Sequence, residues 1–192
     1  MKTIVTAAKL MLVMTLITGL AYPLLISVVA KIFFANKAMG SPILKNGVFI
    51  GSALIGQNFT GQRYFWPRPS VIDYNPLPSG GSNLGPTSAA LKDIIAERRA
   101  LLQAVYGKEK EIPNDLLFAS ASGLDPHISP EAARYQVDRI IKARDLDQLT
   151  KTSFLNLIDK YTESPILGLL GEPRVNVLKL NLALDSLAGV LK

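Results

Sequence analysis

The sequence predicts a single N-terminal transmembrane helix followed by a mixed α+β extracytoplasmic domain. The first observation is an uncharged run from Leu10 to Ala30, which is flanked by the charged residues Lys9 and Lys31. The second is the balance of 48% hydrophobic and 19% charged residues, which excludes a disordered chain. The third is that helical periods alternate with short strand and turn signals after this run.

The uncharged run is long enough to cross a bilayer. At about 1.5 Å per residue it extends roughly 31 Å, and a hydrocarbon core is about 30 Å thick. We therefore expect a tail over 1–9, a transmembrane helix over 10–34 and the main domain over 35–192. The alternative is a signal peptide cleaved after Ala30, with Val28 and Ala30 at the −3 and −1 positions, but the apolar cores of signal peptides usually span only about 7–15 residues.

The charges suggest an orientation and exclude one class of partner. The first acid is Asp73, and seven bases precede it, whereas 14 bases and 15 acids lie from Asp73 onward. The excess of bases therefore belongs to the membrane-proximal part, where it suits lipid headgroups better than nucleic acid. A very short N-terminal tail usually stays inside, so we expect the tail to be cytoplasmic and the main domain to lie outside.

Small or weakly polar residues recur every four positions in the predicted transmembrane helix. They are Thr15, Gly19, Pro23 and Ser27. Small side chains let helices approach closely in lipid, so this ridge is a candidate docking face for a partner helix. Chance spacing is the alternative.

The first part of the outer domain contains a hairpin and a long loop. Asn46-Gly47 predicts a tight turn between strands at 43–44 and 48–50. Residues 51–64 are punctuated by glycine and are expected to be rich in strand. The segment from Trp66 to Pro86, with five prolines and three glycines, predicts a long ordered loop.

Helices dominate the second part. Thr87 or Ser88 is expected to cap a helix that ends near Tyr106, and Ser129 before Pro130 starts one that ends near Arg144. A third helix is expected from 147 to 161. A late strand at 175–178 and an apolar end through Leu191 complete the prediction. The expected inward residues of the first and third helices are Leu91, Ile94, Ile95, Leu101, Leu102, Val105, Leu149, Phe154, Leu157 and Ile158.

Catalytic and metal-binding patterns are scarce. The chain has no cysteine and one histidine, which excludes thiolate metal sites and disulfides. The run Ser79, Gly80, Gly81, Ser82 and Asn83 is a candidate loop for docking a partner or a nucleotide. Its part from Gly80 to Asn83 could form an anion nest, but it lacks the lysine of a P-loop. Ser122 and His127 leave open a membrane-anchored hydrolase, although G-x-S-x-G is absent. A freestanding binding module is a third reading.

Several segments carry a more specific signal. They read GSALIGQNFTG at 51–61, YFWPRPS at 64–70, YNPLPSGGSNL at 74–84, ASASGLDPHISP at 119–130 and RVNVLKLNLALD at 174–185. With the N-terminal anchor, they closely resemble the C subunit of the Kdp potassium-transporting ATPase. The resemblance covers nearly the whole chain. One departure is Trp66-Pro67, where smaller or polar residues are expected.

The resemblance implies a non-catalytic, single-pass accessory subunit of a bacterial inner-membrane complex. The implied partners are a channel-like A subunit, a P-type ATPase B subunit, a small F subunit and the lipid bilayer, with no nucleic acid. The family is described as a catalytic chaperone that raises the ATP affinity of the B subunit. No cofactor is expected to bind to this chain alone. The resemblance implies ATP only through the ATPase subunit. Residues 79–82 are the segment that would inherit a nucleotide role.

Overall fold

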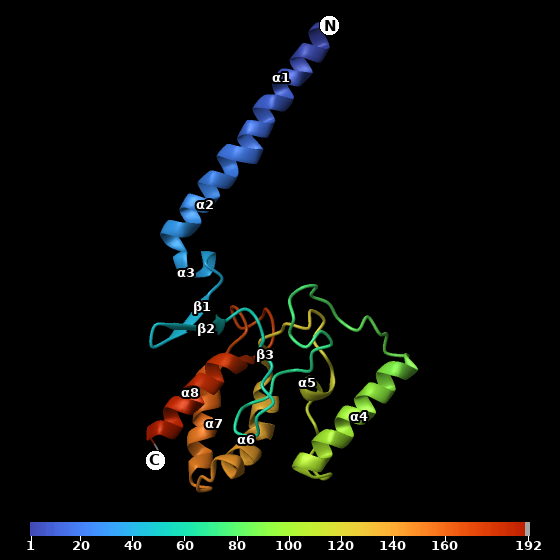
Figure 1. Ribbon diagram of the computed structural model, residues 1–192, viewed down its shortest axis with the longest axis vertical. Coiled ribbons are helices and arrows are strands. Elements are labelled where there is room, and N and C mark those ends of the chain that lie inside the picture. Colours follow the sequence, from blue (N-terminus) through green and yellow to red (C-terminus); the bar gives the residue numbers. More distant parts are fainter. Residues whose placement is uncertain (191–192) are drawn as a thin grey trace. The chain divides into compact units, whose positions relative to one another are not determined.

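The computed structural model describes residues 1–190. The chain forms two compact units, Met1–Ser52 and Ala53–Lys192 (Figure 1). The first unit contains the apolar helix and a hairpin, and the second contains the remaining helices with short strands. The expected architecture of one long apolar N-terminal helix plus a mixed domain is confirmed.

One continuous helical rod from Lys2 to Phe33 is long and apolar enough to cross a membrane. It consists of α1 (Lys2–Leu16), a wide π-helical turn η1 (Ile17–Ala21) and α2 (Tyr22–Phe33). Its large apolar side chains are exposed throughout, as expected for a helix that needs a hydrocarbon solvent. The helix therefore begins at Lys2, within residues 1–9, which were expected to form the tail.

A short helix, α3 (Ala35–Ala38), connects the rod to a two-stranded antiparallel hairpin. The strands are β1 (Pro42–Lys45) and β2 (Val48–Ser52). The turn residues Asn46 and Gly47 have φ values of 54° and 79°. Both lie in the left-handed region that the tight turn requires, so the predicted hairpin is confirmed.

The second unit packs helices around a small antiparallel sheet of order β3-β5-β4. Its helices are α4 (Ala89–Tyr106), α5 (Asn114–Leu117), α6 (Pro130–Arg144), α7 (Thr150–Tyr161) and α8 (Val177–Val190). Its strands are β3 (His127–Ile128), β4 (Thr162–Glu163) and β5 (Arg174–Asn176). Side-chain oxygens of Ser88 and Ser129 cap α4 and α6, which confirms both predicted helix starts.

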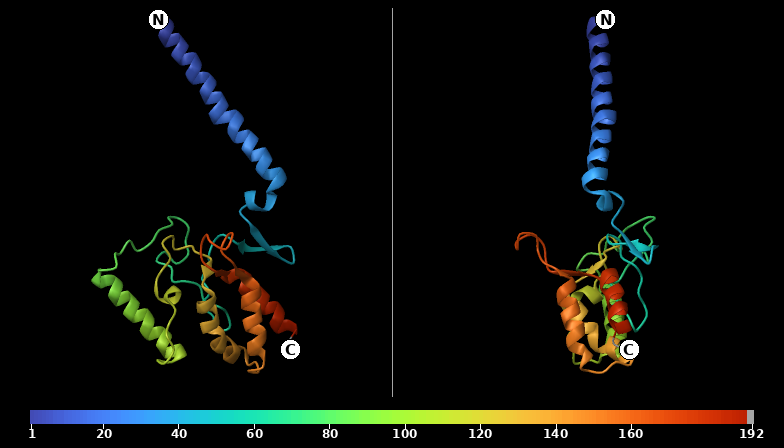
Figure 2. Two further views of the ribbon diagram at one scale, coloured as in Figure 1. Left: turned by 180° about the vertical axis from the view of Figure 1, so that it is seen from behind. Right: turned by 90° about the vertical axis from the view of Figure 1, so that its left-hand side faces the viewer.

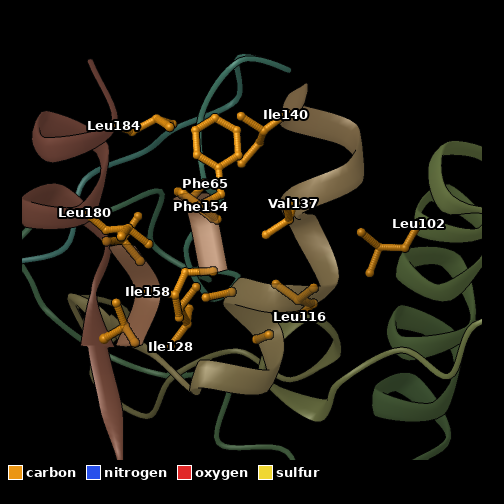
Figure 3. Packing of buried hydrophobic residues seen from close by; sticks show 14 of the residues in the cluster. Phe65, Leu102, Leu116, Ile128, Val137, Ile140, Phe154, Ile158, Leu180 and Leu184 are labelled. Atoms are coloured by element: carbon orange, nitrogen blue, oxygen red, sulfur yellow. The ribbon is translucent and has the colours of Figure 1, made fainter. Parts of the chain in front are cut away.

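The hydrophobic core lies among α6, α7 and α8, which run side by side (Figure 2). Figure 3 shows Phe65, Ile140 and Phe154 in this cluster, all with fully buried side chains. Helix α4 contributes only Leu102 as a buried residue, and Leu101 and Val105 on the same helix are exposed. Leu149 was expected to point inward, but it precedes α7 and is 83% exposed, so that prediction was wrong.

The expectation of strand over 51–64 was wrong beyond Ser52. Residues 53–88 contain no strand or helix, which matches the predicted loop at 66–86. Phe65 and Trp66 belong to no strand, and side chains from helices bond to their backbone groups. Asn181 accepts from the Phe65 N–H (2.8 Å) and donates to its carbonyl (3.0 Å). Gln136 makes the equivalent pair with Trp66, at 2.7 and 3.0 Å.

Two arginines on α6 hold the same segment. Arg139 donates to the carbonyls of Gln62 and Tyr64 and lies 3.9 Å over the Trp66 ring. Arg144 donates to the Arg63 carbonyl and to Asp185 on α8, each at 2.8 Å. Trp66 therefore serves as a stacking surface for a buried cation.

The late strand is shorter than predicted. Strand β5 ends at Asn176, and Val177 and Leu178 already belong to α8. The physical reason is an N-cap, because the Asn176 side-chain oxygen accepts from the Lys179 N–H at 3.1 Å. The apolar end is thus helical as far as Val190, and Leu191 lies outside the described residues.

Candidate functional site

Parts of four of the five segments that carry the family resemblance meet in one place within the second unit. We call residues 54–56, 68–84 and 119–127 the loop cluster. Backbone hydrogen bonds join it: Gly56 N–H to Leu124 O at 2.8 Å, Gly80 N–H to Ser122 O at 3.2 Å and Ser120 N–H to Pro69 O at 3.2 Å. Loops far apart in the sequence are therefore fixed to one another without regular secondary structure.

Glycine is sterically required at three of these crossings, because a Cβ atom at Gly56 would also lie 2.7 Å from the Asp125 carbonyl oxygen. A Cβ atom at Gly81 would lie 2.6 Å from the Ala121 carbonyl oxygen. Gly123 has a φ of +68°, and a Cβ there would lie 2.5 Å from the Ile72 side chain. At Gly80 the same construction meets nothing within 4 Å. The two neighbouring glycines of the predicted loop thus have different roles, since only Gly81 sits at a close backbone contact.

A salt bridge crosses the cluster. Arg68 Nη1 lies 3.1 Å from Asp125 Oδ2, and Asp125 also accepts from the His127 N–H at 2.9 Å. Burial opposes ionisation of Asp125, but hydrogen bonds from His127 and Arg68 outweigh it and lower the pKa of the carboxyl group. The pairing with Arg68 was not foreseen, although both residues stand in the quoted segments.

A half-buried tyrosine, Tyr74, packs beside this salt bridge. The Tyr74 hydroxyl donates to the Arg68 carbonyl, and Ser70 Oγ accepts from the Tyr74 N–H at 2.9 Å. Burial and the nearby charge of Asp125 raise the pKa of Tyr74. The hydroxyl therefore remains a donor at all physiological pH values.

The candidate partner loop lies on this rigid base. Ser79, Ser82 and Asn83 are exposed, and Asn83 has a φ of 53°. Ser82 Oγ accepts from the Leu84 N–H at 3.4 Å, which is a local turn. The Gly80 N–H, which an anion nest would use, is already bonded to Ser122. The geometry suits presentation of polar side chains better than capture of a phosphate.

The residues of the hydrolase alternative do not form a nucleophile–base pair. Ser122 Oγ accepts from the Leu124 N–H at 3.1 Å. His127 Nδ1 faces Asp125 at 3.5 Å, and its Nε2 lies 4.0 Å from Glu163. Nucleophilic catalysis needs the base within hydrogen-bond reach of the serine, and neither ring nitrogen is directed to Ser122 by these contacts.

A cavity of about 540 Å³ lies between residues 58–74 and helix α4. Two of its lining residues are cations, but both are engaged. Arg68 is paired with Asp125, and Arg98 donates to the Leu117 carbonyl at 2.8 Å. A triphosphate would have to displace these partners. Within residues 1–190, no group of three or more His, Cys, Asp or Glu residues could hold a metal ion.

The ridge on the apolar rod is exposed along its length, at Thr15, Gly19, Pro23 and Ser27. A Cβ atom at Gly19 would contact only the Thr15 methyl group of the same helix, at 3.9 Å. The adjacent wide turn is stabilised by a bond from the Tyr22 N–H to the Ile17 carbonyl. The surface beside Gly19 is therefore open to a neighbouring helix.

The family model for the c chain of K⁺-transporting ATPase, KdpC, matches residues 4–186. The chain belongs to the KdpC family. It is 52% identical over 188 residues to the potassium-transporting ATPase KdpC subunit of Polaromonas naphthalenivorans, covering 96% of this chain and 94% of that protein. The corresponding subunit of Dechloromonas aromatica is 48% identical, with 98% and 100% covered. That of Methylococcus capsulatus is 50% identical, with 94% and 96% covered.

Membership in the KdpC family fixes the class of the protein. It is a non-catalytic subunit of the Kdp potassium-transporting ATPase complex, which implies other Kdp subunits as partners. It is associated with the membrane through one N-terminal apolar helix. The hydrolase and freestanding-module alternatives are therefore set aside.

Proposed function

We propose that this chain is the accessory subunit that stabilises the assembled potassium pump and shapes its outer potassium entrance. The nearly full-length match to the KdpC family carries this proposal. In this arrangement the short N-terminal end faces the cytoplasm and residues 35–192 lie outside the bacterial inner membrane. The partners are the channel-like A subunit, the ATPase B subunit and the F subunit.

The orientation determines how the chain acts on ATP. An external domain meets no cytoplasmic nucleotide. Any effect of this chain on the ATP affinity of the B subunit would therefore be transmitted through partner helices, as a coupling free energy. The chain has no native cysteine, so Asn114→Cys provides a single exposed thiol in the main domain. An impermeant reagent added to intact spheroplasts should label it. Labelling only after lysis would reverse the orientation and revive direct nucleotide binding.

The ridge of Thr15, Gly19, Pro23 and Ser27 is the proposed docking face in the membrane. Gly19→Leu adds a bulky side chain where the chain itself leaves space, so only a partner helix is obstructed. Overpacking typically costs about 1–3 kcal/mol, or roughly 5- to 150-fold in association. Membrane insertion should stay normal while recovery of the purified complex falls. Leu16→Ile is the control, and equal recovery of both variants would exclude the docking face.

The exposed loop residues are the proposed docking surface outside the membrane. Replacing Ser79, Ser82 and Asn83 together by Ala removes their polar groups and leaves Gly80 and Gly81 in place. We expect potassium-stimulated ATPase activity of the complex to fall while the thermal stability of the full-length chain stays unchanged. A lower melting temperature with full activity would identify the loop as structural. ATP binding to the wild-type chain alone, lost in this variant, would restore the nucleotide interpretation.

A further inference from the structure

The segment between β4 and β5 is an exposed apolar projection, which we call the finger (residues 164–173). Its side chains are unusually accessible: Ile166 is 64% exposed, Leu167 88%, Leu169 86% and Leu170 64%. Figure 2 shows this orange-red loop extending away from the helices of the second unit. Exposed clusters of large apolar side chains mark contacts with membranes or other proteins.

The finger has a defined tip. The Ile166 N–H donates to the Leu170 carbonyl at 2.9 Å, and the Leu170 N–H donates back to Ile166 at 3.0 Å. Between them, Leu167 and Gly168 have φ values of 56° and 73°. A leucine is rare in the left-handed region, where glycine or asparagine costs less. The closed turn holds its leucines away from the core.

The finger emerges beside the point where the anchor enters the second unit. Asn176, the last residue of β5, donates from its side chain to the Ala53 carbonyl at 2.8 Å. The finger ends at Pro173, only three residues earlier, so its base lies roughly 10 Å or less along the strand from that contact. In the first unit, Ser52 Oγ donates to the Gly40 carbonyl at 2.7 Å, which brings the end of the hairpin back to its beginning.

This connectivity limits the distance between the finger and the bilayer. The hairpin adds little length, and only six residues lie between Phe33 and Gly40, which makes seven Cα–Cα steps. At about 3.6 Å per residue, that segment spans at most about 25 Å even if it were fully extended. The short connection therefore allows the finger to reach lipid, whichever side of the membrane the domain occupies.

We propose that the finger inserts its aliphatic tip into the surface of the bilayer that the N-terminal helix crosses. The four aliphatic side chains have no hydrogen-bonding groups, so they need no directional partner. The hydrocarbon of a lipid bilayer is therefore a suitable environment for them. Protein interfaces, by contrast, favour aromatic residues and arginine and include regular hydrogen bonds. At the base, Glu163 and Glu172 balance Arg174 and Lys179, with Glu163 contacting both bases. Insertion is therefore driven by apolar burial and not by attraction to anionic lipid.

The absence of native cysteine allows a direct test with the full-length chain. Leu167→Cys, and separately Leu169→Cys, would carry a polarity-sensitive fluorophore. The protein would be reconstituted in phosphatidylethanolamine–phosphatidylglycerol vesicles that contain a quencher on the upper acyl chain. Leu149→Cys is the matched control, because Leu149 is 83% exposed and precedes the opposite end of the 12-residue α7, roughly 18 Å away along the helix.

We expect blue-shifted, quenched emission from positions 167 and 169 and water-like, unquenched emission from position 149. The difference should persist in high salt and in vesicles without phosphatidylglycerol. Water-like emission at all three positions would overturn the proposal, as would equal quenching at all three. Shielding of position 167 that appears only after the other Kdp subunits are added would also overturn it, because the finger would then contact protein.

Discussion

Asn181 on α8 offers the sharpest test of how the segment at Phe65 and Trp66 is held. Its side chain satisfies both the N–H and the C=O of Phe65, and it is 2% exposed. Asn181→Leu keeps a similar shape and volume but leaves two buried backbone groups without partners. Each unsatisfied group costs about 1–3 kcal/mol, so we expect a loss of about 2–6 kcal/mol. That is a large part of the roughly 5–15 kcal/mol by which domains are stable.

The sole tryptophan, Trp66, directly follows Phe65, so intrinsic fluorescence reports on this segment. In thermal unfolding of the full-length chain in detergent, about 4 °C per kcal/mol predicts a decrease of roughly 8–24 °C. Asn156→Leu is the control, since Asn156 lies exposed on α7 and the same exchange there should change stability by only about 0.5 kcal/mol. Equal melting temperatures for the two variants would refute the assignment, because solvent would then be satisfying Phe65.

Two further predictions concern the loop cluster. Gly81→Ala should destabilise the full-length chain, because its Cβ would lie 2.6 Å from the Ala121 carbonyl, whereas Gly80→Ala should melt like the wild type; the reverse order would contradict the packing. The pKa of Asp125 is lowered in the folded state, so its contribution to stability is present above about pH 4 and is lost as the pH falls through the folded pKa. Arg68→Gln should therefore reduce the free energy of unfolding at pH 7 and differ less from the wild type below pH 4, and a difference that grows on acidification would argue against the salt bridge.

The accurate sequence predictions rest on local chemistry. Ser88 and Ser129 cap helices within their own first turns, and Asn46-Gly47 closes a hairpin between neighbouring residues. The errors arise where distant residues decide the outcome. The backbone at Phe65 depends on Asn181, 116 positions away, which no local pattern reveals. Leu149 fits the helical period of α7 but stands just before its start.

The error at the late strand was avoidable in part. Val175 and Val177 favour extended structure, yet Asn176 is a good N-cap and the apolar residues Val177, Leu180 and Leu184 follow at helical spacing. Sequence alone identified the segments of the loop cluster through family resemblance. Their meeting point could not be predicted, because it depends on close backbone contacts such as that of Gly81 with Ala121.

The wide turn in the membrane helix bears on whether the small-residue ridge forms one face. In a regular α-helix, each residue advances about 100°, so the 12 positions from Thr15 to Ser27 would accumulate a drift of about 120°. Pro23 lacks the N–H that would bond to the Gly19 carbonyl, and a π-type turn accommodates roughly one extra residue. The observed bond from Tyr22 to Ile17 is such a turn, and it removes about 100° of that drift.

Only about 20° of drift then remains, so Thr15 and Ser27 lie nearly in line. The proline therefore aligns the two halves of the ridge in addition to contributing to it. Gly19 lies within the turn, between Thr15 and Pro23, where a neighbouring backbone would approach most closely. For this reason a large side chain at Gly19 should weaken assembly more than a change at any flanking leucine.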